Sequence, residues 1–216
     1  MPYKAVIFDL DGTLLNTLED IGLSMNRVLE KNGYPVHKLN DYRYFVGEGA
    51  KVLVEKVLPD IAATTENVAL VFKDFETDYS VNWKDRTKPY PGIMDLLSEL
   101  KSRDIKIAIL SNKIHEITIE SVSHFFPRNL FEVVLGQRDQ VPKKPDPTGA
   151  FEIAAALDIP VSDFVYVGDT AIDMKTANAA AMYPVGVLWG FRPESELSAN
   201  GAGMLIDNPM MLLSLF

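Results

Sequence analysis

Five short apolar runs recur along the chain, each rich in β-branched residues and apolar at consecutive positions. They are AVIFDL (5–10), IKIAIL (105–110), EVVLG (132–136), FVYVG (164–168) and PVGVLWG (184–190). Runs that are apolar on both faces are typical of strands in a parallel sheet that helices cover on each side. The pattern therefore predicts the strands of a buried parallel sheet.

Helical patterns alternate with these runs. GIMDLLSELKSR (92–103) has apolar residues near i, i+3 and i+4, and PTGAFEIAAALDI (147–159) is rich in Ala and Leu. Alternating strands and helices form α/β folds in which right-handed crossovers join parallel strands. We therefore predict an α/β fold with a central parallel sheet wound on both faces.

One interval interrupts the alternation. Residues 18–79 contain several amphipathic helical stretches and no convincing strand. A segment of roughly 60 residues is too long for an ordinary loop. We predict a small all-helical cap domain at 16–85, inserted after the first strand, and an α/β core formed by 1–15 and 86–216.

Composition narrows the functional classes. Of 216 residues, 47% are hydrophobic, the net charge is −9 and there is no cysteine. Nucleic acids and anionic membranes recruit basic surfaces, so we expect neither as a partner. No run approaches the roughly 20 apolar residues of a membrane helix, and the N-terminus is a poor secretory signal. We expect a cytoplasmic protein and leave its oligomeric state open between monomer and homodimer.

Two aspartates follow the first apolar run. Side chains two apart on a strand point the same way, so Asp9 and Asp11 can face one crevice at the carboxyl end of the sheet. Gly12 permits a tight turn, and Thr13 offers a hydroxyl to a carboxylate or a ligand oxygen. A polar turn that ends a strand is the plain alternative.

Other predicted strands also end in polar residues. Ser111 and Asn112 follow the second run, and Asp169 and Asp173 follow the fourth, four apart and on one face if a helix starts there. Lys144 precedes Pro145 in the connection before the next helix. Each feature alone has a structural explanation, such as a loop start or a helix cap, but together they fall at one edge of one sheet.

Several acids in one crevice predict a cation. Two carboxylates 4 Å apart repel by about 4 kcal/mol in a partly screened site, and Mg²⁺ prefers oxygen ligands and substrate phosphate. Ser111, Asn112 and Lys144 can then bind a phosphoryl group. A carboxylate can act as the nucleophile while a second one handles protons.

These segments resemble the haloacid dehalogenase superfamily of Mg²⁺-dependent phosphotransferases, whose core is Rossmann-like. Its four motifs occur in order as DLDGT (9–13), SN (111–112), KP (144–145) and GDTAID (168–173). The resemblance, including the helical insert, covers essentially the whole chain. It implies a Mg²⁺-dependent enzyme acting on a small phosphorylated metabolite.

The resemblance assigns roles to matching residues. It makes Asp9 the nucleophile and a metal ligand, and Asp11 the general acid and base, with its backbone carbonyl on the metal. Ser111 and Lys144 bind the phosphoryl group. Asp169 ligates Mg²⁺, and Asp173 holds its water shell.

A finer resemblance is to the phosphoglycolate phosphatases. YFVGEGAKVLVEKVL (44–58) resembles their cap segment, in which a Gly-x-Gly loop opens a helix. Gly47, Gly49 and their backbone amides can receive a substrate carboxylate, whereas Glu48 facing the site would repel it. Arg43 and Lys51 can bind an anionic tail, although each is also an ordinary surface cation.

The leading hypothesis is a Mg²⁺-dependent hydrolase of small phosphomonoesters that acts through an aspartyl-phosphate, with 2-phosphoglycolate as the favoured substrate. The alternatives within the superfamily are a phosphosugar mutase of the β-phosphoglucomutase type and a pyrophosphatase or nucleotidase. Displacement of halide is disfavoured because it has no use for Asp11 or the metal acids. A phospho-acceptor binding module is the non-enzyme alternative, and Asp11 and the cap argue against it.

Overall fold

The chain folds as two compact units. The computed structural model describes residues 3–216. One unit comprises the residues up to Leu15 together with Pro89–Phe216, and the other is Asn16–Lys88. We call them the core unit and the inserted unit.

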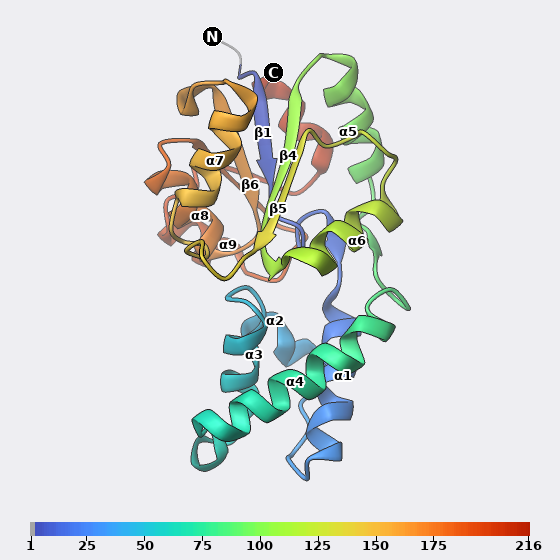
Figure 1. Ribbon diagram of the computed structural model, residues 1–216. Helices are drawn as coiled ribbons and strands as arrows, with labels where there is room; N and C mark the ends of the chain where they lie inside the picture. Colours follow the sequence, from blue (N-terminus) through green and yellow to red (C-terminus); the bar gives the residue numbers. More distant parts are fainter. Residues whose placement is uncertain (1–2) are drawn as a thin grey trace. The chain divides into compact units, whose positions relative to one another are not determined.

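The core unit contains a six-stranded sheet in the order β5-β4-β1-β6-β7-β8 (Figure 1). All five neighbouring pairs are parallel. The strands are β1 (Ala5–Phe8), β4 (Lys106–Ile114), β5 (Val133–Gln137), β6 (Phe164–Gly168), β7 (Tyr183–Val187) and β8 (Met204–Ile206). Counted along the chain, this is the Rossmann order, whose ligand crevice lies where the order reverses, here between β1 and β6.

Side-chain alternation divides the core into two layers. Val6 and Phe8 of β1 belong to a cluster that includes α5 (Ile93–Ser102), whereas Ala5 and Ile7 belong to a cluster that includes α7 (Thr148–Leu157). Figure 1 shows α7 on one side of the sheet and α5 on the other. The strands are therefore apolar on both faces, as their sequences predict.

The remaining elements of the core unit cover the sheet and its edges. They are α6 (His115–Phe125), α8 (Ala171–Ala179), α9 (Glu194–Ala199) and the 3-10 helices η3 (Val161–Asp163) and η4 (Pro209–Leu215). At the junctions between the units, β2 (Leu15–Asn16) pairs with β3 (Lys88–Pro89). The three-residue β8 has no counterpart among the predicted strands, because so short a segment carries little periodicity.

The inserted unit is helical between its junction strands. Its elements are α1 (Leu18–Lys31), α2 (Tyr42–Phe45), α3 (Ala50–Val57), α4 (Thr65–Asn82) and the 3-10 helices η1 (Leu39–Asp41) and η2 (Asp60–Ala62). Arg27 of α1 bonds both carboxylate oxygens of Asp78 of α4. The buried Asp20 accepts hydrogen bonds from the backbone N–H groups of Arg86 and Thr87, which ties both ends of this unit together. The predicted α/β fold with a helical insertion is confirmed.

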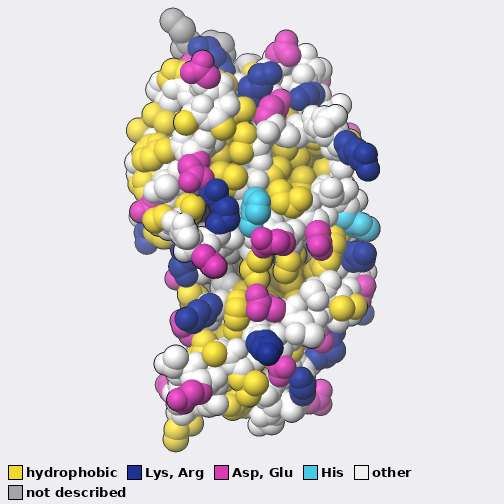
Figure 2. Space-filling view, viewed as in Figure 1, with side chains coloured by type: hydrophobic (Ala, Val, Ile, Leu, Met, Phe, Trp, Pro, Cys, Tyr) yellow, Lys and Arg dark blue, Asp and Glu magenta, His cyan; other side chains and the backbone are white. Residues whose placement is uncertain are grey.

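Figure 2 shows how charged side chains are distributed over one face of the molecule. Acidic and basic side chains are interspersed over that face, and the basic side chains form no continuous patch on it. Among residues 3–216, no helix combines the length and the apolarity that crossing a bilayer requires.

Candidate active site

The carboxyl ends of the central strands carry a buried charged cluster. Asp9 directly follows β1, and its Oδ1 accepts a hydrogen bond of 2.8 Å from Nζ of Lys144. The same ammonium donates to Oδ1 of Asp173 at 2.7 Å. All three side chains are less than 10% exposed. Predicted residues from three distant segments thus meet at one point.

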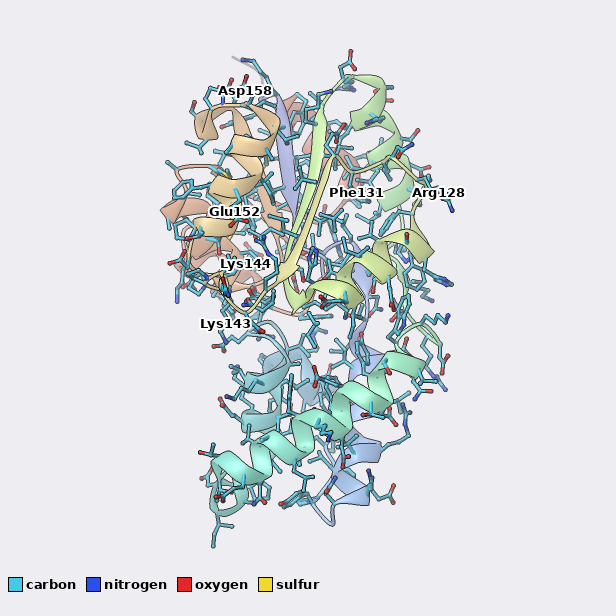
Figure 3. The ribbon with its side chains drawn as sticks, in the orientation of Figure 1. Arg128, Phe131, Lys143, Lys144, Glu152 and Asp158 are labelled. Carbon is cyan, nitrogen blue, oxygen red and sulfur yellow. The ribbon has the colours of Figure 1, made fainter. Side chains whose placement is uncertain are left out.

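Asn112 fixes the loop that carries Lys144. Its side chain forms two hydrogen bonds with the backbone of Lys144, accepting at 2.9 Å from the N–H and donating at 3.1 Å to the carbonyl. The Lys144–Pro145 peptide bond is cis. Figure 3 labels Lys144 and the exposed Lys143 on this loop between β5 and α7. The Asn112 side chain therefore holds the backbone of Lys144 in place.

Asp169 is fully buried after β6. Its Oδ1 accepts a hydrogen bond from the Thr13 hydroxyl at 3.1 Å, and its Oδ2 accepts one from the backbone N–H of Phe191 at 2.7 Å. A Cβ on Gly12 would lie 2.3 Å from Oδ2 of Asp169, and one on Gly190 would lie 2.2 Å from its Cβ. Only glycine therefore lets both loops approach this carboxylate. Thr13 uses its hydroxyl on a carboxylate, one of the two uses predicted for it.

Asp173 has a double role at the start of α8. Its Oδ2 accepts from the backbone N–H and the hydroxyl of Thr170, the N-cap residue, in a capping box. Its Oδ1 binds Lys144. Because α8 begins after Asp169, the two acids do not share a helix face as their spacing suggested. The loop before the helix brings them together instead.

Asp11 has a partner that the sequence analysis missed. Nζ of Lys113 lies 3.2 Å from both carboxylate oxygens of Asp11, and these side chains are 7% and 14% exposed. The Ser111 hydroxyl accepts a hydrogen bond from the N–H of Lys113 at 3.2 Å. The sequence pattern offers no signal for this partner, because the pairing of β4 with β5 is irregular between Leu110 and Ile114.

Burial and mutual repulsion determine the electrostatics of the cluster. Burial raises the pKa of Asp9 to about 7, although Lys144 acts to lower it. Burial and the charges of Asp173 and Asp9 raise the pKa of Asp169 well above its usual value. Burial would lower the pKa of Lys144, but Asp173 and Asp9 raise it well above its usual value. The one ammonium therefore does not neutralise the three carboxylates.

The donor set fits a divalent cation. Asp9, Asp169 and Asp173 can each offer one carboxylate oxygen, and these oxygens lie within 4.8 Å of one another. With Lys144 included, this cluster keeps an excess of two negative charges when its acids are ionised. Hard oxygen ligands with such an excess favour a hard divalent ion. The Asp11 carboxylate lies outside this group and pairs with Lys113.

The predicted specificity residues lie in the inserted unit. Arg43 belongs to α2, and Lys51 is exposed on α3. Gly47 and Gly49 have φ values of 126° and 89°, which favour glycine. Glu48 forms a 2.6 Å ion pair with Lys56 of the same unit. The loop at 47–49 therefore leads directly into α3, as the Gly-x-Gly pattern predicts.

Comparison with known proteins establishes the family. The sequence model of the haloacid dehalogenase-like hydrolases matches residues 6–187. The chain belongs to the haloacid dehalogenase-like hydrolase family. This match includes all four motif segments and the inserted unit between the first two.

Relatives within the family narrow the class. A phosphoglycolate phosphatase of Cereibacter sphaeroides is 34% identical over 204 residues, which cover 91% of each chain. A phosphoglycolate phosphatase of Pseudomonas putida is 28% identical, and the match covers 97% of this chain and 78% of the relative. The predicted resemblance to the phosphoglycolate phosphatase subgroup and the predicted class, a phosphoric monoester hydrolase, are both confirmed.

Solved structures support the fold across both units. The crystal structure of a candidate phosphoglycolate phosphatase from Lactobacillus delbrueckii superposes with a TM-score of 0.93 at 32% identity, covering 98% of this chain and 97% of that one. A haloacid dehalogenase-like hydrolase from Streptococcus pneumoniae has a TM-score of 0.89 at 19% identity, covering 98% and 97%. At that lower identity the likeness supports the fold alone.

Proposed function

We propose that this phosphatase hydrolyses small phosphomonoesters with Mg²⁺ through a phosphorylated Asp9, and that 2-phosphoglycolate is its leading substrate. One observation carries the proposal. Asp9 lies buried against Lys144, with oxygens of Asp169 and Asp173 near enough to share one cation. This arrangement supports the proposal because the candidate nucleophile, a lysine able to bind phosphoryl oxygens and a set of carboxylates able to hold a metal ion lie together at one strand end.

The first half-reaction transfers the phosphoryl group to Asp9. Lys144 engages Oδ1, so we assign the attack on phosphorus to Oδ2. The new O–P bond forms as the ester P–O bond breaks, and Asp11 gives its proton to the departing alcohol oxygen. Ser111 and Lys144 bind the phosphoryl oxygens during the transfer.

The second half-reaction regenerates the enzyme. The Asp11 carboxylate takes a proton from water as the water oxygen bonds to phosphorus, and the bond between phosphorus and Asp9 breaks. The products are the alcohol and orthophosphate, which balance the ester and one water. Asp9 and Asp11 end in their starting protonation states.

Asp9 and Asp169, with the backbone carbonyl of Asp11, would hold Mg²⁺. The ion would neutralise the excess carboxylate charge and the phosphoryl oxygens. Asp173 has three donors on its two oxygens, namely Lys144, the Thr170 N–H and the Thr170 hydroxyl. We therefore assign it to the shell around the ion, where it also holds Lys144.

The inserted unit would serve as the cap that excludes bulk water and selects the substrate. Gly47, Gly49, Arg43 and Lys51 are the candidates for binding an anionic substrate tail. Glu48 is compatible with an anionic substrate because Lys56 offsets its charge at 2.6 Å. The support for 2-phosphoglycolate is the set of phosphoglycolate phosphatase relatives.

A substrate screen tests the proposal. Orthophosphate release would be measured from 2-phosphoglycolate, sugar phosphates, nucleoside monophosphates and pyrophosphate, with Mg²⁺ and with chelator. We expect release from small monoesters that chelator abolishes and that Asp9→Asn reduces by at least about 10³-fold. Equal rates with chelator would remove the metal role. Isomerised product without orthophosphate would identify a mutase instead.

A further inference from the structure

We infer that Lys113 is a positioning residue for the reaction, holding the carboxyl group of Asp11 in place for the two proton transfers, from the protonated acid to the leaving alcohol and then from water back to the carboxylate. The inference rests on the proposed function, because it concerns the acid that the proposal assigns to Asp11. Neither the motif segments nor their spacing singles out this lysine. It follows from the contacts at the end of β4.

The contact between the two residues is symmetric and shielded. Nζ of Lys113 lies 3.2 Å from Oδ1 and 3.2 Å from Oδ2 of Asp11. An ammonium equally near both oxygens restrains rotation of the carboxyl group, because either rotation lengthens one of the two contacts. With side-chain exposures of 7% and 14%, solvent screens the pair weakly.

An irregularity in β4 directs Lys113 to this position. In the pairing with β5, Leu110 lies opposite Leu135 and Ile114 lies opposite Gln137. Four steps along β4 therefore match two along β5, and the additional residues lie within Ser111–Lys113. Bulges of this kind re-aim side chains and are over-represented next to active sites. The distortion coincides with the candidate phosphate-binding segment.

The backbone of Asp11 is restrained separately. Asp11 forms an isolated bridge with Leu15, and the N–H of Gly12 donates to the Leu15 carbonyl at 2.8 Å. The turn therefore fixes the position of the Asp11 backbone, and the contact with Lys113 fixes the position of its carboxyl group. Both are needed because catalytic groups lose efficiency when displaced by about 1 Å.

The role differs from binding the phosphoryl group. Lys144 already contacts the nucleophile Asp9, whereas Lys113 contacts the acid. In the step concerned, the ester P–O bond breaks, the bond between Asp9 and phosphorus forms, and the Asp11 proton moves to the alcohol oxygen. Lys113 gains and loses no proton. Replacing Lys113 should therefore lower the rate of phosphoryl transfer most for substrates whose leaving group must be protonated as it departs.

Two substrates separate these roles. An alkyl phosphate such as 2-phosphoglycolate loses a strongly basic alkoxide unless it is protonated, whereas p-nitrophenyl phosphate loses a stable phenolate. The ratio kcat/KM reports formation of the phosphorylated enzyme, before the hydrolytic step that both substrates share. We expect Lys113→Met to lower kcat/KM for the alkyl ester by roughly ten- to hundred-fold, within the contribution of general acid catalysis, and for the aryl ester by about threefold or less.

The experiment compares the holoenzyme with Lys113→Met, Lys113→Arg, Asp11→Asn and the double variant Asp11→Asn with Lys113→Met. Lys106→Met is the matched control, because Lys106 is an exposed lysine at the opposite end of the same strand. Circular dichroism checks folding. The alkyl substrate is 2-phosphoglycolate, or the alkyl monoester that the wild type hydrolyses fastest in the screen.

Three results would support the inference: a selective alkyl loss in Lys113→Met, partial recovery in Lys113→Arg, and no added loss in the double variant over Asp11→Asn. Equal losses for both substrates, or a full additional loss in the double variant, would overturn it and leave the proposed function standing. If Lys113→Met does not fold, the kcat/KM values of Lys113→Gln and Lys113→Arg for the alkyl and the aryl substrate are compared instead. A wild type without Mg²⁺-dependent phosphate release would overturn both proposals.

Discussion

The ammonium of Lys144 lies 2.7 Å from Oδ1 of Asp173, joining a loop after β5 to a helix 29 residues further along the chain. The same ammonium contacts Asp9, so one cation links the nucleophile candidate to the capping box of α8. Because all three groups are buried, this link affects stability as well as chemistry.

Replacing Lys144 removes the cation from this cluster. We expect Lys144→Met to abolish detectable phosphate release and to lower the free energy of unfolding by about 3 kcal/mol, because it leaves the buried carboxylates of Asp9 and Asp173 without their counter-cation. Urea denaturation of the metal-free protein measures the second effect. Lys143→Met, at the exposed neighbouring position, is the control and should change both quantities little. If Lys144→Met unfolded with the same free energy as the wild type, this would contradict the buried ion pairs of Lys144 with Asp9 and Asp173.

Metal binding can be measured without activity. Mg²⁺ at about 100 times its Kd should stabilise the protein by about 2.7 kcal/mol, seen as a rise in Tm. Asp169→Asn removes a ligand and should abolish most of the rise. Asp163→Asn, just before β6 in an exposed pair with Lys4, should retain it. An unchanged rise in Asp169→Asn would exclude this carboxylate as a ligand.

Gly12 tests the close approach to Asp169. Gly12→Ala would combine a left-handed φ of 91° with a Cβ 2.3 Å from the Asp169 carboxylate. Gly33→Ala has the same kind of strain, at a φ of 74°, but no heavy atom within 4 Å. We expect Gly33→Ala to cost about 1–2 kcal/mol and Gly12→Ala more, with activity reduced at least about tenfold. Equal effects of the two substitutions on unfolding and activity would show that the short distance between Gly12 and the Asp169 carboxylate does not require glycine at position 12.

Glu132 gives the core unit a dependence on acid pH. Burial alone would raise the pKa of Glu132, but hydrogen bonds from Lys101 at 2.7 Å and the Ile107 N–H at 2.8 Å hold it below its usual value. A lowered pKa means that the ionised group stabilises the fold above about pH 4.5 and that this contribution is lost as pH falls through the lowered value.

The variant Glu132→Gln isolates this contribution. Its deficit in unfolding free energy relative to the wild type should be larger near pH 7 than at about pH 3. Chemical denaturation at the two pH values measures it, and Glu120→Gln, on an exposed face of α6, serves as the control. A deficit that stays constant with pH would mean that the charge of Glu132 contributes nothing.

The sequence by itself determined the five longer strands of the sheet and the edge at which the residues that follow three of them lie. Consecutive apolar runs require burial on both faces, so AVIF, IAIL and VYV had to lie in one covered parallel sheet. Because parallel strands end at the same edge, Asp9, Ser111 and Asp169 had to lie along that edge. These conclusions need only local periodicity and the direction of the chain.

Only the tertiary structure decided which charges pair. Asp11 meets Lys113 across 102 positions, and Lys144 meets Asp9 across 135. Such contacts depend on turn geometry, on the irregularity in β4 and on glycines that allow loops to approach within van der Waals contact. A shift of one residue at a bulge turns a side chain to the other face of a sheet, so periodicity carries no information about these pairings.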